Sequence, residues 1–166
     1  MTNLTALTAT NIGYNALFTA DAALSAFLNS KDADWAATQT IAPTDVTATS
    51  LDGAVVLVSW LPVAYTSAAG YYKVMISEAP GGPYTLAGQT ENKTASSVQV
   101  TGLTPGTRYY FVVRTVTDAH ANNLNVVESG DSAEASAIAW LQTEVQISGT
   151  VTAGGAPLAG VVLEGL

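Results

Sequence analysis

The chain of 166 residues contains no cysteine, and it has only 5 basic residues against 13 acidic ones. The absence of thiols excludes disulfide bonds, thiol catalysis and cysteine-ligated metal sites. Binding of nucleic acid, which is a polyanion, relies on clustered Lys and Arg. Because the bases are scattered and the formal net charge is −8, no nucleic-acid partner is expected, and an anionic membrane surface is disfavoured for the same reason.

Long apolar runs are also missing. No run reaches the roughly 18–20 residues that span a bilayer, so we expect no membrane span. The segment from Met1 to Leu28 has no basic residue before Lys31, and Asp21 interrupts its apolar stretch, which is not typical of a signal peptide. Either a leader has been removed, or the protein reaches its destination without one, as a virion protein does.

The residues that are present indicate a folded, all-β chain. Hydrophobic residues make up 48% of it and charged residues 11%, which is the opposite of the balance in disordered chains. Thr and Val are abundant, and they favour the pleated, half-buried surface of a sheet. Helices rich in Lys and Glu are absent.

Short segments with turn signals between them fill residues 43–142. Tyr72, Val74 and Ile76 share one parity, and Pro80-Gly-Gly-Pro83 predicts a turn. The predicted strands are 44–49, 54–60, 71–77, 84–87, 97–101, 109–117 and 133–140. Seven strands in about a hundred residues are typical of an immunoglobulin-like sandwich.

One stretch in this region is more specific. Gly102-Leu-Thr-Pro-Gly-Thr-Arg-Tyr-Tyr-Phe-Val-Val-Arg114 resembles the fibronectin type III sequence Leu-x-Pro-Gly-Thr-x-Tyr that leads into strand F. The resemblance implies that Leu103 plugs one end of the sandwich and that Tyr109 forms a tyrosine corner, with a buried ring and a hydroxyl bonded to nearby backbone. It also implies that Trp60 ends strand B in the core. The polar connection over 118–131 is longer than this pattern expects, and the family often carries recognition residues there.

The N-terminal segment, residues 1–42, predicts one short helix at about 20–29. Leu24, Phe27 and Leu28 fall at i, i+3 and i+4 and form one apolar stripe, and Thr19 or Asp21 could cap the start. A helix this short is marginal by itself, so the stripe is expected to dock on the following domain or on a neighbouring subunit. The alternation near Leu4 is compatible with a strand.

The C-terminal segment, residues 143–166, has a different pattern. Ile147-Ser-Gly-Thr-Val-Thr152 followed by Gly154-Gly-Ala-Pro-Leu-Ala-Gly-Val161 resembles the opening hairpin of carboxypeptidase regulatory-like domains, which have no catalytic role of their own. A lone hairpin is at best marginally stable in water. We therefore expect Val161, Val162 and Leu163, or the strand near Leu4, to complete the sheet of a neighbouring molecule.

No catalytic constellation emerges from the titratable residues. His120 is the single histidine, and with Asp118 it could orient a nucleophilic serine, but no Gly-x-Ser-x-Gly elbow is present. We interpret His120 as an exposed loop residue. The acidic residues stand singly at turns and strand ends, where solvated surface acids are more common than a glycosidase pair.

Metal sites and cofactors are not expected either. Asp32-Ala-Asp34 has the spacing that opens a calcium loop, but the central Gly and the terminal Glu of an EF-hand do not follow. Weak calcium binding across the loop by Asp118, Glu128 and Asp131 remains an alternative.

Three tryptophans and two glycosylation sequons are the remaining candidate sites. Trp60 is assigned to the core, Trp140 to the junction with the C-terminal segment, and Trp35 is the tryptophan most typical of an interface. Asn3-Leu-Thr5 and Asn92-Lys-Thr94 match the glycosylation sequon, which has meaning only in a secretory pathway that glycosylates.

These observations favour a non-enzymatic structural or interaction protein. The leading hypothesis is a subunit of an extracellular fibre, surface appendage or virion, which forms a homo-oligomer or filament through its terminal segments. The alternative is a spacer or carbohydrate-binding module of a larger secreted enzyme or adhesin. Either reading places the protein outside the cell, on a cell surface or in a virion.

Overall fold

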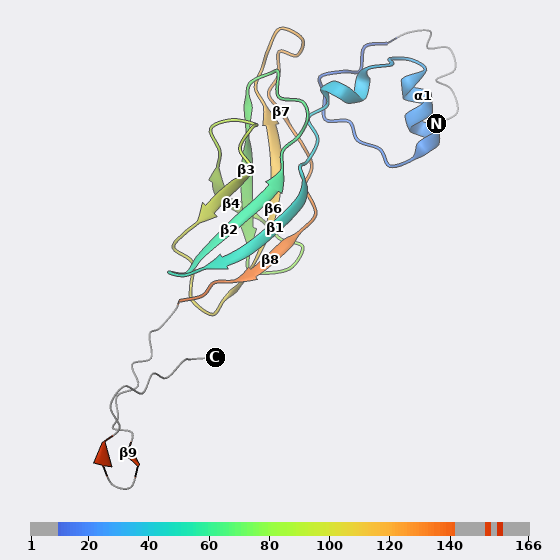
Figure 1. The fold of residues 1–166 in the computed structure, drawn as a ribbon. Helices are drawn as coiled ribbons and strands as arrows, with labels where there is room; N and C mark the ends of the chain where they lie inside the picture. Colours follow the sequence, from blue (N-terminus) through green and yellow to red (C-terminus); the bar gives the residue numbers. More distant parts are fainter. Residues whose placement is uncertain (1–9, 142–151, 154–155, 158–166) are drawn as a thin grey trace.

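The computed structural model describes residues 10–141, 152–153 and 156–157, and its main body is a sandwich of two antiparallel sheets (Figure 1). One sheet has the order β1-β2-β5. The other has the order β4-β3-β6-β7, with β8 also paired to β6. The first sheet contains Thr44–Leu51 (β1), Val55–Leu61 (β2) and Ser97–Val100 (β5). The second contains Gly70–Ser77 (β3), Thr85–Gln89 (β4), Arg108–Thr117 (β6), Val127–Glu128 (β7) and Ala135–Ile138 (β8).

The core lies between the sheets because alternate residues of each strand point inward. Val56 and Val58 on β2 are fully buried, as are Val74 on β3 and Phe111 and Val113 on β6. On β2 and β3 the neighbouring positions face outward and are more exposed, which is the period of two that a strand with one buried face requires. The central strand β6 also buries residues on its other face, such as Val112. The all-β, immunoglobulin-like sandwich expected from the sequence is therefore confirmed.

Each of the predicted strands has a counterpart in the structure, with ends that differ by a few residues. The largest difference concerns the last strand, predicted over 133–140. The structure has β8 at Ala135–Ile138 and, before it, the two-residue β7, which pairs Val127 and Glu128 with Thr117 and Val116. A strand of two residues inside a polar connection has no periodicity that the sequence could display.

Residues 10–42 form a small N-terminal lobe at one end of the sandwich (Figure 1). Its helix α1 spans Ala22–Asn29, shorter at its start than predicted, because Asp21 is the N-cap and its side chain accepts a hydrogen bond from the amide of Leu24. A single 3₁₀ turn, η1, follows at Trp35–Thr38. The lobe then leads directly into β1.

Beyond residue 141 the structure describes only two short strands, Thr152–Ala153 (β9) and Ala156–Pro157 (β10), which pair antiparallel. These four residues do not test the resemblance to a carboxypeptidase regulatory-like hairpin, which stays a prediction. Val161, Val162 and Leu163 lie outside the described residues, as does the strand predicted near Leu4.

Candidate functional site

The fibronectin-like residues named from the sequence lie in the scaffold. Tyr109 on β6 is 6% exposed, and its hydroxyl accepts a hydrogen bond from the amide of Thr104 at 3.2 Å. Trp60 is 5% exposed and donates from Nε1 to the carbonyl of Ala95 at 3.1 Å. Leu103 is partly buried and packs against the core. These side chains hold the sandwich together and present no group to a ligand.

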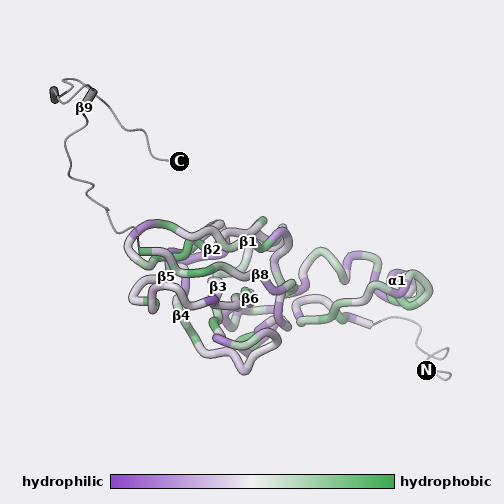
Figure 2. The backbone as a smooth tube through the Cα atoms, turned by 90° about the horizontal axis from the view of Figure 1, so that it is seen from below, coloured by the Kyte–Doolittle hydropathy of each residue, from purple (hydrophilic) through white to green (hydrophobic). Residues whose placement is uncertain are grey.

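The apolar stripe of α1 is only half covered. Leu24, Phe27 and Leu28 are of intermediate exposure, and the helix has no fully buried residue. Figure 2 shows α1 in hydrophobic colours on the side of the lobe away from the sandwich. The ammonium of Lys31 lies 5.4 Å from the centre of the Phe27 ring. The stripe is therefore partly exposed.

One of the tryptophan assignments needs correction. Trp35, expected at an interface, is 4% exposed, and its Nε1 donates to Oδ1 of Asn29 at 2.8 Å. The expectation was wrong because η1 turns this ring inward and makes it the core of the lobe. Trp140, by contrast, is 59% exposed and lines a groove of about 280 Å³ with Ser50, Leu51, Asp52 and Leu141.

The lobe meets the sandwich at a group of aromatic side chains. The ring of Tyr14 makes edge contacts with the rings of Tyr65 and His120, at centroid distances of 6.1 and 5.5 Å. The carbonyl of Tyr14 accepts a hydrogen bond from Nδ2 of Asn123 at 2.7 Å. Tyr14 has a φ of +59°, a conformation that a bulky residue adopts only where its surroundings enforce it. The position of Tyr14 is thus fixed both by the lobe and by the sandwich.

A buried cation lies behind these rings. Lys93 is 3% exposed, its Nζ donates to Oγ1 of Thr117 at 3.1 Å, and it lies 4.3 Å from the centre of the Tyr65 ring. Burial lowers the pKa of Lys93, and the negative charge of Asp118 opposes that shift. Oγ1 of Thr117 also lies 2.7 Å from Oγ1 of Thr40 in the lobe. We call Tyr14, Thr40, Tyr65, Lys93, Thr117, His120 and Asn123 the junction cluster.

His120 was expected to be an exposed loop residue, and it is instead half-buried in this cluster. Its Nε2 lies 3.4 Å from the hydroxyl of Tyr65, and its Nδ1 accepts a hydrogen bond from the amide of Asn122 at 3.2 Å. A nucleophilic triad needs a serine on one ring nitrogen and an acid on the other. The partners of His120 are a phenol and a backbone amide, so the contact is structural.

The carboxylates of the long connection are held by bases. Glu128 accepts from Nζ of Lys73 at 2.6 Å and from Arg114 at 3.2 Å, and Asp131 accepts from Nε of Arg114 at 2.5 Å. The hydrogen bond from Lys73, followed by that from Arg114, lowers the pKa of Glu128. A glycosidase acid needs a raised pKa, and a calcium ion needs oxygens that no cation already neutralises. This network supports neither role.

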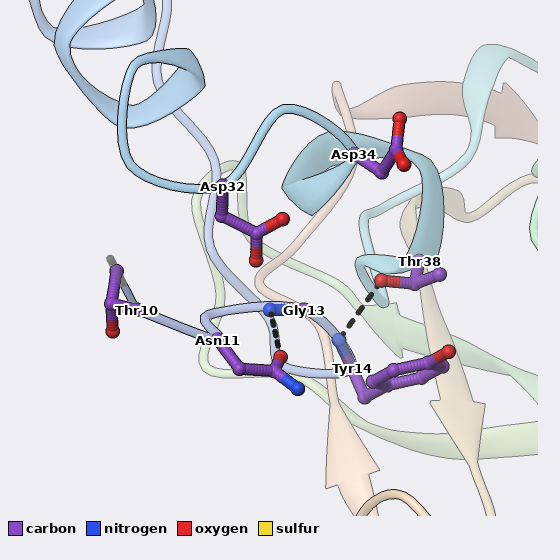
Figure 3. Close-up of a pocket in the computed structure, with 7 residues that line it drawn as sticks. All are labelled: Thr10, Asn11, Gly13, Tyr14, Asp32, Asp34 and Thr38. Carbon is purple, nitrogen blue, oxygen red and sulfur yellow. Dashed lines mark hydrogen bonds between the residues drawn. The ribbon is translucent and has the colours of Figure 1, made fainter. Parts of the chain in front are cut away.

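A polar cavity of about 310 Å³ occurs inside the lobe (Figure 3). The side-chain oxygens of Asn11, Asp32 and Thr38 accept hydrogen bonds from the amides of Gly13, Ile12 and Tyr14, at 3.2, 3.0 and 3.0 Å respectively. Asp34 also lines the cavity, but its carboxylate points away from Asn11 (Figure 3). The two aspartates do not converge. No cluster of three or more metal-ligating side chains occurs among the described residues.

The most exposed apolar surface of the lobe was not found from the sequence. Phe18 is 78% exposed and Leu17 41% exposed. Phe18 and Ile41 line two grooves, one of about 280 Å³ that Pro43 and Ala133 also line, and one of about 220 Å³ that Leu17 and Trp35 also line. We call Leu17, Phe18 and Ile41 the Phe18 ridge. The only signal in the sequence was the apolar run Ala16-Leu-Phe18 between polar residues.

The chain is similar to several known proteins, and the family model among them agrees with this fold. A family model described as "Fibronectin type III domain" matches residues 41–127, just over half of the chain. A solved Fn3-like protein from Clostridium thermocellum is 31% identical, with a TM-score of 0.48, over 64% of this chain and 98% of that chain. A β-1,2-glucanase from Parabacteroides distasonis is 21% identical, with a TM-score of 0.48, over 62% of this chain and 13% of that chain.

A structure of the chicken CNTN1 FN1–FN3 domains is 23% identical, with a TM-score of 0.46, over 59% of this chain and 30% of that chain. The chain thus spans only a small part of the glucanase and under a third of the chicken protein fragment. No curated protein matches it significantly. Within the described residues, no helix has the length and apolar character needed to cross a membrane.

Proposed function

The chain belongs to the fibronectin type III family, and we propose that it is a non-enzymatic structural subunit of an extracellular fibre, surface appendage or virion. In this proposal the sandwich is a rigid spacer, and the segments before and after it bind other copies of the same chain. Strand pairing by the terminal segments then links the copies.

The observation that carries the proposal is the exposed apolar surface at both ends of the sandwich. β1 begins at Thr44, which lines the same groove as Phe18, and it ends at Leu51, which lines the groove of Trp140. Eight residues of strand separate these ends by about 25 Å. Phe18 is 78% exposed at the first end, and Trp140 and Leu141 are 59% and 51% exposed at the second. Different apolar surfaces at opposite ends support head-to-tail contacts, which form filaments when they do not close into rings.

Light scattering and negative-stain electron microscopy of the purified full chain test the proposal. We expect filaments or large regular particles, and we expect deletion of residues 145–166 to abolish them while the far-UV circular dichroism of the sandwich is retained. Replacing Phe18 by Ser should weaken the assembly. A full chain that stays a monomer of 17.0 kDa at high concentration contradicts the proposal.

A second candidate function is a carbohydrate-binding spacer of a larger secreted enzyme or adhesin. The specific observation in its favour is the exposed ring of Trp140 beside a groove lined by Ser50 and Asp52, since sugars stack on exposed aromatic rings and hydrogen-bond to adjacent polar groups. Glycan-array binding by a monomeric chain, lost in Trp140→Ala and retained in Phe18→Ser, would favour this function over self-assembly.

A further inference from the structure

The strand edges of the sandwich differ in how they are protected. Native sheets shield exposed edges with charges, proline, bulges or covering segments, because an open edge is a template for another strand. Among the described strands, β1 carries Asp45 near its start, and β7 carries Glu128, which bonds to Lys73 and Arg114. The short β8 is covered on its side toward β1, where the hydroxyl of Ser50 donates to the carbonyl of Ile138.

The edge strand β4 has a bulge but lacks the charges and the proline that shield other edges. Its five residues, Thr85-Leu-Ala-Gly-Gln89, include no charge and no proline, and within the described part of the chain β4 pairs only with β3. Leu86 is 54% exposed. The pairing with β3 skips Ala87, so a bulge divides the strand into two short runs on either side of it. The neighbouring edge strand β5 is also uncharged, but it is shorter and has no exposed large apolar side chain.

The C-terminal sequence has the properties of a strand that could occupy this edge. Residues 158–166 include Val161, Val162 and Leu163 and only one charged side chain, Glu164. Val161 and Val162 are β-branched residues, which are enriched in strands. The 10 residues over 142–151 reach up to about 35 Å when extended, and the β9–β10 hairpin then turns the chain back before this segment begins.

We propose that the uncharged edge of β4 accepts residues 158–166 of a second copy of the chain as an added strand. The inference rests on the proposed function and names the acceptor surface that the function requires. The incoming strand pairs with the backbone of β4 and covers Leu86, so the β4-β3-β6 sheet of one molecule is extended by the end of the next.

The first test is a charge on the edge, with a matched control on another strand. Leu86→Lys places a positive charge on the edge of β4, and Leu61→Lys places one at the end of β2 on a leucine that is equally exposed, at 57%. In sedimentation velocity we expect Leu86→Lys to weaken self-association on the order of tenfold or more, a loss of about 1.4 kcal/mol. The control variant should associate like the wild type, and both should keep the thermal midpoint of the sandwich.

The possible outcomes distinguish the proposed self-assembly from the proposal that β4 is the acceptor strand. Wild-type association that Leu86→Lys leaves unchanged overturns β4 as the acceptor and leaves the proposed function standing. A wild-type chain that does not associate at all overturns both. Equal weakening by Leu61→Lys also overturns β4, because it shows a general effect of charge.

The second test uses the absence of native cysteine, which makes engineered disulfides unambiguous. Cysteines joined by a disulfide need Cα atoms within about 7 Å. Mixing Leu86→Cys with Val161→Cys, Val162→Cys or Leu163→Cys under mild oxidation should give a covalent heterodimer for at least one pair. Leu61→Cys should give none with the same partners. A double variant that forms only an internal disulfide, with no heterodimer in the mixtures, shows pairing within one copy and overturns the proposal.

Discussion

The sandwich and the N-terminal lobe are stabilised in different ways. β2, β3 and β6 each bury several large apolar side chains in one continuous core, whereas Trp35 is the only buried apolar side chain that the structure describes in the lobe. The lobe relies on hydrogen bonds that its own backbone amides donate to the side chains of Asp32, Thr38 and Gln39, and on the junction cluster. Hydrogen bonds contribute less net free energy than the burial of a large core.

The difference indicates a division of roles. The sandwich folds around its own core, so it can serve as a scaffold that tolerates changes at its surface. The lobe leaves Phe18 and part of the stripe of α1 exposed, so part of the apolar surface that could stabilise it is not buried within the lobe. Segments of low local stability are those from which binding elements are usually drawn.

The largest effect is expected from a cavity in the sandwich. Phe111→Ala removes a fully buried ring between the sheets and should lower the free energy of unfolding by about 3–5 kcal/mol. Urea denaturation followed by tryptophan fluorescence measures the change. A loss below about 1 kcal/mol would show that the core does not dominate stability.

The matching change in the lobe should act locally. Trp35→Ala removes the buried ring of the lobe, which costs about 3–5 kcal/mol of local stability, more than so small a segment is expected to have. We expect rapid proteolytic cleavage within residues 10–42, while the urea midpoint of the sandwich stays close to that of the wild type. If Trp35→Ala destabilised the sandwich as much as the lobe, the two regions would unfold as one unit.

A smaller effect is expected from the tyrosine corner. Tyr109→Phe keeps the buried ring but removes the acceptor of the Thr104 amide, and it should cost about 1 kcal/mol. Chemical denaturation of the variant beside Tyr110→Phe, a half-buried neighbour on the opposite face, isolates the hydrogen bond. If both variants lost the same small amount of unfolding free energy, the loss would come from removing any tyrosine hydroxyl and not from this hydrogen bond.

The smallest effect concerns the buried cation of the junction cluster. Burial lowers the pKa of Lys93 from 10.5, so the unfolded chain binds more protons than the folded one between the lowered pKa and 10.5. The free energy of unfolding should therefore rise with pH across this window. Lys93→Met should remove this rise. The measurement is the free energy of unfolding of the wild type and of the variant as a function of pH. Burial raises the pKa of Tyr72, but Tyr72 is present in both proteins, so its titration does not distinguish them. Identical slopes of the unfolding free energy against pH in the wild type and in Lys93→Met would contradict the prediction.

Much of the sandwich could be predicted because the sequence patterns that indicate it lie within single strands and turns. The stretch from Gly102 to Arg114 specifies a turn and a strand, and the alternation of Tyr72, Val74 and Ile76 specifies the face that β3 buries. The core position of Trp60 was implied by the resemblance to fibronectin type III sequences, and Trp60 is 5% exposed in the structure.

The junction cluster could not be predicted, because it is built from residues far apart in the sequence. Tyr14 and Asn123 are 109 positions apart, and neither belongs to a periodic segment. His120 was placed in solvent because its neighbours are polar, yet its burial is decided by Tyr14 and Tyr65. Trp35 was the tryptophan named as a candidate for an interface for a similar reason, since a single 3₁₀ turn gives no apolar period.

Native-state hydrogen exchange of the full chain tests the central claim most directly, since it compares the two regions in one molecule. The account predicts that the amides of β3 and β6 exchange only through global unfolding, and that those of α1 exchange much faster, through local opening of the lobe. It also predicts that Phe111→Ala accelerates β3 and β6, while Trp35→Ala accelerates α1 alone. Equally slow exchange of α1 and β6 in the wild-type chain would contradict the account, because it would make the lobe part of the scaffold.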